Sequence, residues 1–199
     1  DCGSALAEAE VEYQDKTSAA VDVAFDAIDP AAFASAFGVD WQGPIAVAIW
    51  TTTPWTLAAN RGVSLNADLS YVLIRVGDRA VVIAEGLLET CAERFGIESP
   101  DVLGSVMGAA LDRLMLKHPF AELQVPVMLG DHVTLDAGTG CVHTAPAHGL
   151  EDFEIGKRYG LEVYNPVGGN GVYLPGTPVF EGKHIFKAND EIIAELEAR

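Results

Sequence analysis

The 199-residue chain is 49% hydrophobic and 21% charged, an ordinary composition for a globular protein that can bury one core. No apolar run approaches the ~20 residues of a membrane-spanning helix, so no membrane partner is expected. The formal charge is −17 and the 12 basic residues are scattered. This balance excludes a protein that binds nucleic acid tightly unaided, because such proteins neutralise phosphates with clustered lysine and arginine.

The first half of the chain is predicted to be rich in strands. Residues 8–16 and 20–28 alternate apolar and polar side chains, which is typical of a hairpin. Asp29 is expected to cap a short helix that ends near residue 37. An apolar run over residues 45–49 predicts a buried strand.

Residues 50–60 follow this strand and read Trp-Thr-Thr-Thr-Pro-Trp-Thr-Leu-Ala-Ala-Asn. Thr51, Thr52 and Thr53 place hydroxyls on both sides of the chain, because successive strand side chains alternate faces. Pro54 ends the ladder because it has no N–H to donate. The stretch predicts one wall of a pocket for a small polar group, although a plain β-branched strand and turn would explain the same residues.

The remaining elements are short as well. We expect a hairpin over residues 71–76 and 80–84, a helix over 85–95, strands over 101–107, 123–128, 132–135 and 161–164, a helix over 150–159, a tight turn at 168–171, and a last helix capped by Asn189 or Asp190. Many short strands with a few helices predict an α+β fold, a strand-rich, β-barrel-like domain with peripheral helices.

A second polar stretch covers residues 138–153 and reads Gly-Thr-Gly-Cys-Val-His-Thr-Ala-Pro-Ala-His-Gly-Leu-Glu-Asp-Phe. Asp152 is expected near the start of a helix, where a carboxylate interacts favourably with the helix dipole even without a ligand. His143 is expected on a strand, where a core histidine with one satisfied nitrogen is the ordinary alternative to a functional one.

Together the two stretches resemble the editing domain of bacterial isoleucyl-tRNA synthetases, and the resemblance covers nearly the whole chain. Related valyl and leucyl domains carry Thr-Thr-Arg-Pro, whereas here Pro54 follows Thr53 directly. Ala58 departs from the proline expected in Leu-Pro-Ala-Asn. The resemblance implies hydrolysis of valine wrongly esterified to isoleucine tRNA. Its partners would be the 3′ end of that tRNA, the valine moiety and the rest of the synthetase in cis.

The resemblance also implies roles for individual residues. Asp152 would hold the α-ammonium group of the substrate, and His143 would close the amino-acid pocket against a larger side chain. The three consecutive threonines would orient the ester carbonyl and the attacking water. Trp50, Asn60 and His148 complete the implied substrate-binding set.

The chain starts Asp-Cys-Gly without a methionine, so we interpret residues 1–199 as one editing domain cut from a larger protein. Three distant cysteines do not suggest a disulfide framework, and a reducing cytoplasm is expected. The resemblance implies that Cys2 belongs to a zinc pair of the longer protein. Alone it cannot bind a metal, and no metal or cofactor is expected here.

Two other functions fit part of the sequence. His143, His148 and Asp152 have the spacing His-x4-His-x3-Asp, which is compatible with a metal-dependent hydrolase. A module that binds the amino acid or the tRNA without turnover is the other alternative.

Overall fold

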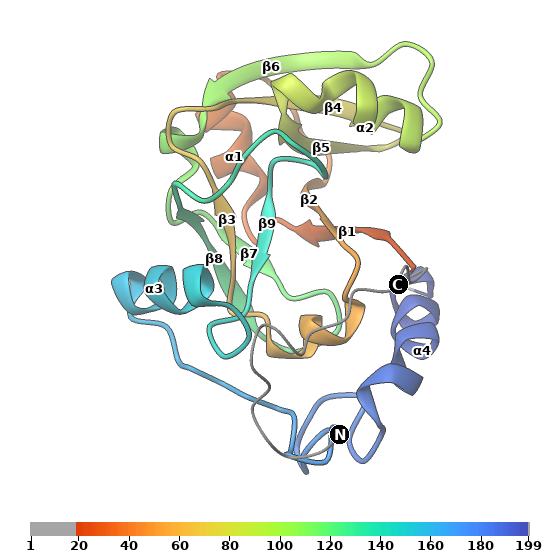
Figure 1. The fold of residues 1–199 in the computed structure, drawn as a ribbon. Helices are drawn as coiled ribbons and strands as arrows, with labels where there is room; N and C mark the ends of the chain where they lie inside the picture. The colour runs from red at the N-terminus through yellow and green to blue at the C-terminus, as the bar shows by residue number, and fades with distance from the viewer. Residues whose placement is uncertain (1–18, 199) are drawn as a thin grey trace.

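The computed structural model describes residues 19–198, whose strands form two β-sheets (Figure 1). One sheet has the strand order β1-β2-β5-β4-β6 and the other the order β7-β8-β3-β9. The strands are β1 (Val21–Asp26), β2 (Ile45–Thr51), β3 (Gly62–Leu65), β4 (Ser70–Val76), β5 (Arg79–Ala84), β6 (Asp101–Met107), β7 (Met115–Lys117), β8 (Gln124–Leu129) and β9 (Val142–Thr144).

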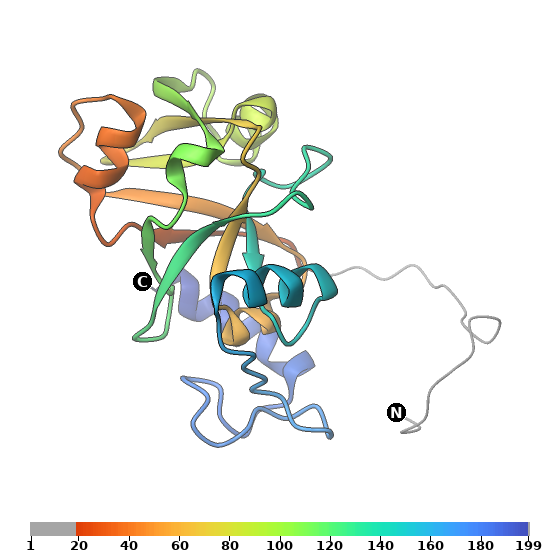
Figure 2. The same ribbon diagram turned by 90° about the vertical axis from the view of Figure 1, so that its left-hand side faces the viewer.

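Helices surround the two sheets. In Figure 2, α1 and α2 lie in the upper half with the five-stranded sheet, whereas α3 and α4 lie in the lower half. None of the helices described between residues 19 and 198 is long and apolar enough to cross a membrane. The helices are α1 (Pro30–Phe37), α2 (Leu88–Arg94), α3 (Leu150–Tyr159) and α4 (Ile185–Glu197), with 3-10 turns η2 (Pro54–Ala59), η3 (Glu85–Leu87) and η4 (Gly108–Leu111).

Strand β2 lies inside the five-stranded sheet, between β1 and β5. It pairs antiparallel with β1 and parallel with β5, and only Trp50 among its residues is not fully buried. Burial on both faces explains why its sequence is a continuous apolar run rather than an alternating one. The predicted buried strand is therefore confirmed, and it extends two residues further, to Thr51.

Several predicted elements are confirmed in detail. The Asp29 carboxylate caps α1 by accepting the backbone N–H groups of Ala31 and Ala32, at 3.0 and 3.1 Å. Strands β4 and β5 form the predicted hairpin, whose turn uses the positive φ of Gly77. The predicted helices over residues 85–95 and 150–159 are present, although the first turn of the former is the 3-10 turn η3.

The α+β class is confirmed, but the described strands close no barrel. The two sheets are separate ladders. Between them, Ala27 bridges to Leu116, and the Ile28 N–H donates to the Met115 carbonyl at 2.9 Å. Strands β2 and β9 also lie close to each other.

Two predicted strands are wrong. Residues 132–135 are irregular, because Thr134 bonds the Asp136 side chain locally instead of joining a ladder. Residues 161–164 are irregular, because the Leu161 N–H already donates to the Gly156 carbonyl at the end of α3. The short strands β3 and β7 were not predicted.

The last helix begins earlier than predicted. His184 rather than Asn189 or Asp190 is its N-cap, and Ile185 and Ile192 lie on its buried face. Apolar spacing that starts at Ile185 therefore determines where the helix begins. In the predicted hairpin over residues 8–16 and 20–28, the first strand lies outside the described residues, and the second, β1, pairs with β2.

The loop over residues 138–141 is bonded at every carbonyl. Gly138 O accepts from Arg94, Thr139 O from the Ala84 N–H, Gly140 O from the Tyr71 hydroxyl, and Cys141 O from the Thr139 hydroxyl. Gly140 has a φ of 72°, and a Cβ added there would lie 2.2 Å from the Ala84 Cβ. The Gly-Thr-Gly sequence thus allows a close approach to β5 directly before β9.

This packing predicts a large difference between two glycine variants. Gly140→Ala should lower the free energy of unfolding by about 3 kcal/mol, from left-handed strain and overpacking against Ala84. Gly77 has a φ of 64° with open space around it, so Gly77→Ala should cost only about 1 kcal/mol from strain alone. Urea denaturation compares the two, and equal losses would contradict the close packing at Gly140.

Candidate functional site

The two polar stretches meet at the ends of β2 and β9. Both strands run toward the η2 turn, and Figure 1 shows β9 descending through the middle of the molecule beside β2. Thr56 Oγ1 lies 2.9 Å from His143 Nε2, although the two residues are 87 positions apart. This contact joins the threonine stretch to the histidine stretch.

The hydroxyls of the threonine stretch are linked to one another. Thr51 Oγ1 accepts the Thr53 N–H at 3.0 Å and lies 3.3 Å from Thr53 Oγ1. Thr53 Oγ1 lies 3.5 Å from Thr56 Oγ1. Thr51 is buried, whereas Thr52 and Thr53 are exposed to solvent. The stretch therefore presents a row of linked hydroxyls that leads from the surface to His143.

This network determines the tautomer of His143. The Thr56 hydroxyl donates its proton to the Thr53 carbonyl at 2.8 Å, so its oxygen accepts a hydrogen bond from His143 Nε2–H. His143 Nδ1 then carries the lone pair, and it is buried without a hydrogen-bond partner in the described structure. A buried acceptor with no partner is costly unless a ligand or water occupies it.

His143 is held neutral by its surroundings. Burial lowers its pKa to about 4, and His118 and His148 lower it further in the same direction. The imidazole is thus a neutral group at pH 7, with one donor committed to Thr56 and one acceptor available.

Asp152 lies in the first turn of α3, as predicted. Its Oδ2 accepts the backbone N–H of Ala145 at 3.0 Å, which ties α3 to the residue directly after β9. Burial raises the pKa of Asp152, while the Ala145 amide and His132 lower it again. The Ala145 amide therefore connects Asp152 to the strand that carries His143. In the described structure Asp152 makes no direct hydrogen bond to the threonine stretch.

His148 lies just before α3, outside the helix, because Gly149 is the N-cap. Its ring meets the Trp55 ring edge-on, with centroids 5.2 Å apart. Burial lowers the pKa of His148, whereas the Asp152 carboxylate raises it. His148 thus connects the η2 turn to the helix that carries Asp152.

Thr56 and Trp55 are the residues that sequence reasoning missed. Both follow Pro54 in the first motif, where the predicted site residues are Trp50, the three consecutive threonines and Asn60. A Thr that follows Pro by two residues in a tight turn carries no separate signal in the sequence. The contacts of Thr56 with His143, and of Trp55 with His148, are visible only in the fold.

Among residues 19–198, the buried polar atoms without partners are concentrated near this site. They are Asn60 Oδ1, His143 Nδ1, His148 Nε2, His132 Nε2 and, elsewhere, Asn189 Oδ1. Three of the five belong to residues predicted for the site, and His132 interacts electrostatically with Asp152. Native proteins leave few buried polar groups unpaired, so such a concentration is typical of a binding site.

Trp50 and Asn60 have supporting positions. Trp50 is half-buried, and a Cβ added at Gly138 would touch its Cβ at 3.4 Å. The Asn60 side-chain N–H donates to the Gly62 carbonyl at 2.9 Å and thereby shapes the turn into β3. Trp50 therefore packs against the loop before β9, and Asn60 stabilises the end of η2.

The described residues give the metal-dependent alternative no geometric support. Between residues 19 and 198, no group of three or more His, Cys, Asp and Glu side chains lies close enough to hold a metal ion. Cys2 lies outside this range. The spacing of His143, His148 and Asp152 in sequence is therefore not matched by a cluster of ligands in space.

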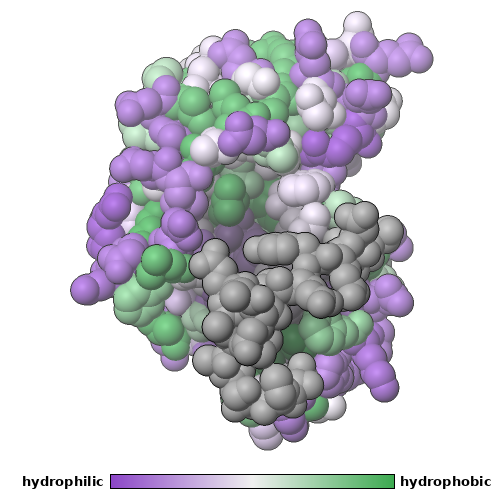
Figure 3. All heavy atoms as spheres, in the orientation of Figure 1, coloured by the Kyte–Doolittle hydropathy of each residue, from purple (hydrophilic) through white to green (hydrophobic). Residues whose placement is uncertain are grey.

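Two hollows of about 540 Å³ lie away from the motifs. One runs along β1 and is lined by Asp22, Arg79 and Lys117 among others. The other lies beside α2. The face drawn in Figure 3 is hollowed near its centre, with hydrophilic residues along the left side of the hollow and hydrophobic residues within it. The candidate site is identified by the contacts between the two motifs and not by the size of a cavity.

Comparison with known proteins agrees with the motifs and the fold. A family model described as "Leucyl-tRNA synthetase, editing domain" matches residues 37–172. The chain is 58% identical to an isoleucine–tRNA ligase of Shewanella sp. (strain MR-7) and 54% identical to one of Pseudoalteromonas atlantica. Each match covers 100% of this chain but only 22% of the relative, so the chain spans about a fifth of these proteins.

Solved structures with this fold have very different sequences. One described as "The crystal structure of GlLeuRS-CP1" matches with a TM-score of 0.73 at 14% identity, over 90% of this chain and 96% of that one. The editing domain of Plasmodium (P. knowlesi) cytosolic leucyl-tRNA synthetase matches with a TM-score of 0.68 at 10% identity, over 94% and 97%. The resemblance that we inferred from the two motifs is confirmed, and the chain belongs to the editing-domain family of the aminoacyl-tRNA synthetases.

Proposed function

We propose that this chain hydrolyses the ester bond of valine wrongly attached to isoleucine tRNA. The observation that carries the proposal is the hydrogen bond between Thr56 and His143, which brings the two motifs into one site. The isoleucine specificity is supported by the identity to isoleucine–tRNA ligases and by Pro54 directly after Thr53.

The reaction is needed because binding in one pocket discriminates poorly between amino acids that differ by one methylene. A hydrophobic pocket discriminates one methylene by only about 1–3 kcal/mol, and isoleucyl-tRNA synthetases are themselves the known example of this limit. A second pocket that is too small for isoleucine corrects the error, because steric exclusion rises far more steeply than the attraction of one methylene.

In the proposed mechanism Asp152 binds the α-ammonium group of the substrate. An aminoacyl ester carries one fixed positive charge there, and a partly buried carboxylate binds it with charge-assisted hydrogen bonds. His143 closes the end of the side-chain pocket as a neutral ring, since its pKa of about 4 keeps it uncharged at pH 7. A neutral wall suits an aliphatic side chain better than an imidazolium would.

The threonine stretch is proposed to orient the scissile carbonyl and a water molecule. Its hydroxyls and backbone N–H groups are donors that can stabilise a developing oxyanion, and its hydroxyl oxygens can accept a hydrogen bond from the water. His143 is a weak base with this pKa, so positioning of the water rather than proton abstraction by the protein supplies most of the rate.

The tRNA is proposed to be held mainly by the rest of a longer protein. The chain has a formal charge of −17, and the relatives that it matches are several times longer.

A single-turnover assay with valyl-tRNA separates hydrolysis from the alternative of a non-catalytic binding module. A chelator added to the same assay tests the metal-dependent alternative, since the proposed reaction needs no metal ion.

Asp152 and its neighbour Glu151 provide a matched pair of variants. Asp152→Asn should lower kcat/KM for valyl-tRNA deacylation by roughly thirtyfold to a thousandfold, about 2–4 kcal/mol, because the ammonium loses its charged partner. Glu151→Gln removes an exposed acid from the same helical turn and should leave the rate near wild type. Equal rates for the two variants would remove the anchor role of Asp152.

Size exclusion predicts a gain of activity. His143→Ala should increase the hydrolysis of correctly charged isoleucyl-tRNA by roughly 10–100-fold, because it opens the end of the pocket. The ratio of valyl to isoleucyl deacylation rates measures the effect. A ratio unchanged from wild type, in a variant whose circular dichroism shows a native fold, would contradict the assignment.

The neutral state of His143 predicts a pH dependence of stability. Its pKa is about 4 in the folded chain and about 6.5 when unfolded, so stability is complete above pH 6.5, falls between pH 6.5 and 4, and falls no further from this group below pH 4. Imidazole NMR signals of His143 should titrate near pH 4 in the native chain. A native midpoint near 6.5 would show that the ring is solvated.

A further inference from the structure

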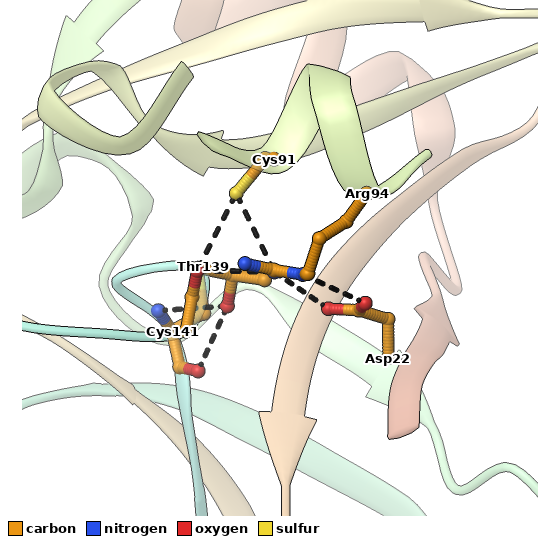
Figure 4. A network of polar contacts seen from close by, with 6 residues as sticks. Asp22, Cys91, Arg94, Thr139 and Cys141 are labelled. Carbon is orange, nitrogen blue, oxygen red and sulfur yellow. Dashed lines mark hydrogen bonds and ion pairs between the residues drawn. The ribbon is translucent and has the colours of Figure 1, made fainter. Parts of the chain in front are cut away.

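Arg94, at the C-terminal end of α2, connects three separate parts of the fold (Figure 4). Its Nε and one terminal nitrogen donate to the two carboxylate oxygens of Asp22 in β1, at 3.1 and 2.8 Å. The same terminal nitrogen lies 3.1 Å from the carbonyl oxygen of Gly138. The Arg94 guanidinium thus joins the end of α2 to strand β1 and to the loop before β9.

The Gly138 carbonyl begins the loop that leads to His143. It also accepts the Cys91 thiol at 3.4 Å, so two side chains from α2 hold it. The next three carbonyls are bonded as well, to β5, to Tyr71 and to Thr139. A loop with all its carbonyls bonded is rigid, and its position determines where β9 starts.

Asp22 connects the same guanidinium to the threonine stretch. In the β1–β2 ladder its register partner is Trp50, the residue directly before Thr51. Gly138 also lies close to the Trp50 side chain, because a Cβ added at Gly138 would be 3.4 Å from the Trp50 Cβ. Arg94 therefore lies where the start of the threonine stretch and the start of the loop that leads to His143 come together.

We propose that Arg94 is a positioning residue of the editing site, which with Asp22 fixes the start of β9 against the end of β2. It touches no reacting atom in this account. Its effect is to set the separation between the threonine hydroxyls and His143, and a misplacement of about 1 Å can cost roughly 100-fold in rate. The inference rests on the function proposed above.

Arginine suits this position better than lysine. The planar guanidinium donates in two directions at fixed angles, to a carboxylate and to a carbonyl, whereas a lysine ammonium is a single point charge on a flexible stem. Both partners are partly shielded, with side-chain exposures of 28% for Arg94 and 26% for Asp22. The ion pair is therefore less screened by solvent than one on the open surface.

The chain contains a matched control. Arg79 pairs with Asp26, also in β1, at 3.5 Å and with exposures of 40% and 47%. It makes no contact with the loop over residues 138–141 in the described structure. Arg79→Met therefore removes a comparable charge pair on the same strand without touching the proposed path to His143.

The experiment compares Arg94→Met, Arg94→Lys and Arg79→Met in the 199-residue chain, with single-turnover deacylation of valyl-tRNA and imidazole NMR of His143 as the two readouts. Arg94→Met should lower the rate constant about 10–100-fold with little change in the substrate concentration at half-saturation. It should also shift the His143 signals. Arg94→Lys should fall between Arg94→Met and wild type, and Arg79→Met should match wild type in both readouts.

The outcomes separate this inference from the proposed function. A wild-type chain with no deacylase activity at saturating valyl-tRNA, where weak tRNA binding no longer limits the rate, overturns the proposed function, and the positioning role of Arg94 falls with it. If the wild type is active, equal rates and unchanged His143 signals in Arg94→Met overturn the positioning role alone. A lower melting temperature in Arg94→Met with the rate and the His143 signals of wild type means that the contact only stabilises the fold, which also overturns it.

Discussion

The hydrogen bond from His143 Nε2 to Thr56 Oγ1 is the contact on which the candidate site depends. It joins the η2 turn, which follows β2, to β9 of the other sheet, and it commits the Nε2 proton so that Nδ1 remains an acceptor. Because Thr56 donates to the Thr53 carbonyl, the contact also fixes the orientation of the threonine stretch. The bond is a direct side-chain link between the two motifs that the proposed reaction needs together.

The fold holds this contact in place from both ends. On one side β2 is buried between β1 and β5, so the threonines follow a rigid strand. On the other side the bonded loop over residues 138–141 delivers β9, and α3 returns Asp152 to the Ala145 amide. Most of the polar groups of the site belong to elements that the core positions. Such an arrangement favours catalysis by positioning.

Sequence patterns predicted much of this architecture, and the failures have physical causes. The capped helix α1, the buried strand β2 and the hairpin on Gly77 follow from local signals, which is why they could be predicted. The start of α4 depends on which apolar face packs on the core, so the local capping residue Asn189 was misleading. Within the site, the threonines, His143 and Asp152 were recognisable from motifs. Thr56, Trp55 and Arg94 were not, because each contacts a residue far away in the sequence.

The central claim is that both motifs bind one aminoacyl group. The most direct test is a crystal structure of the chain with a non-hydrolysable valyl-adenosine analogue. The account predicts the α-ammonium group within hydrogen-bond distance of the Asp152 carboxylate and the valine methyl groups against the His143 ring. An analogue bound elsewhere, for example in the hollow between Asp22, Arg79 and Lys117, with no contact to either motif, would contradict it.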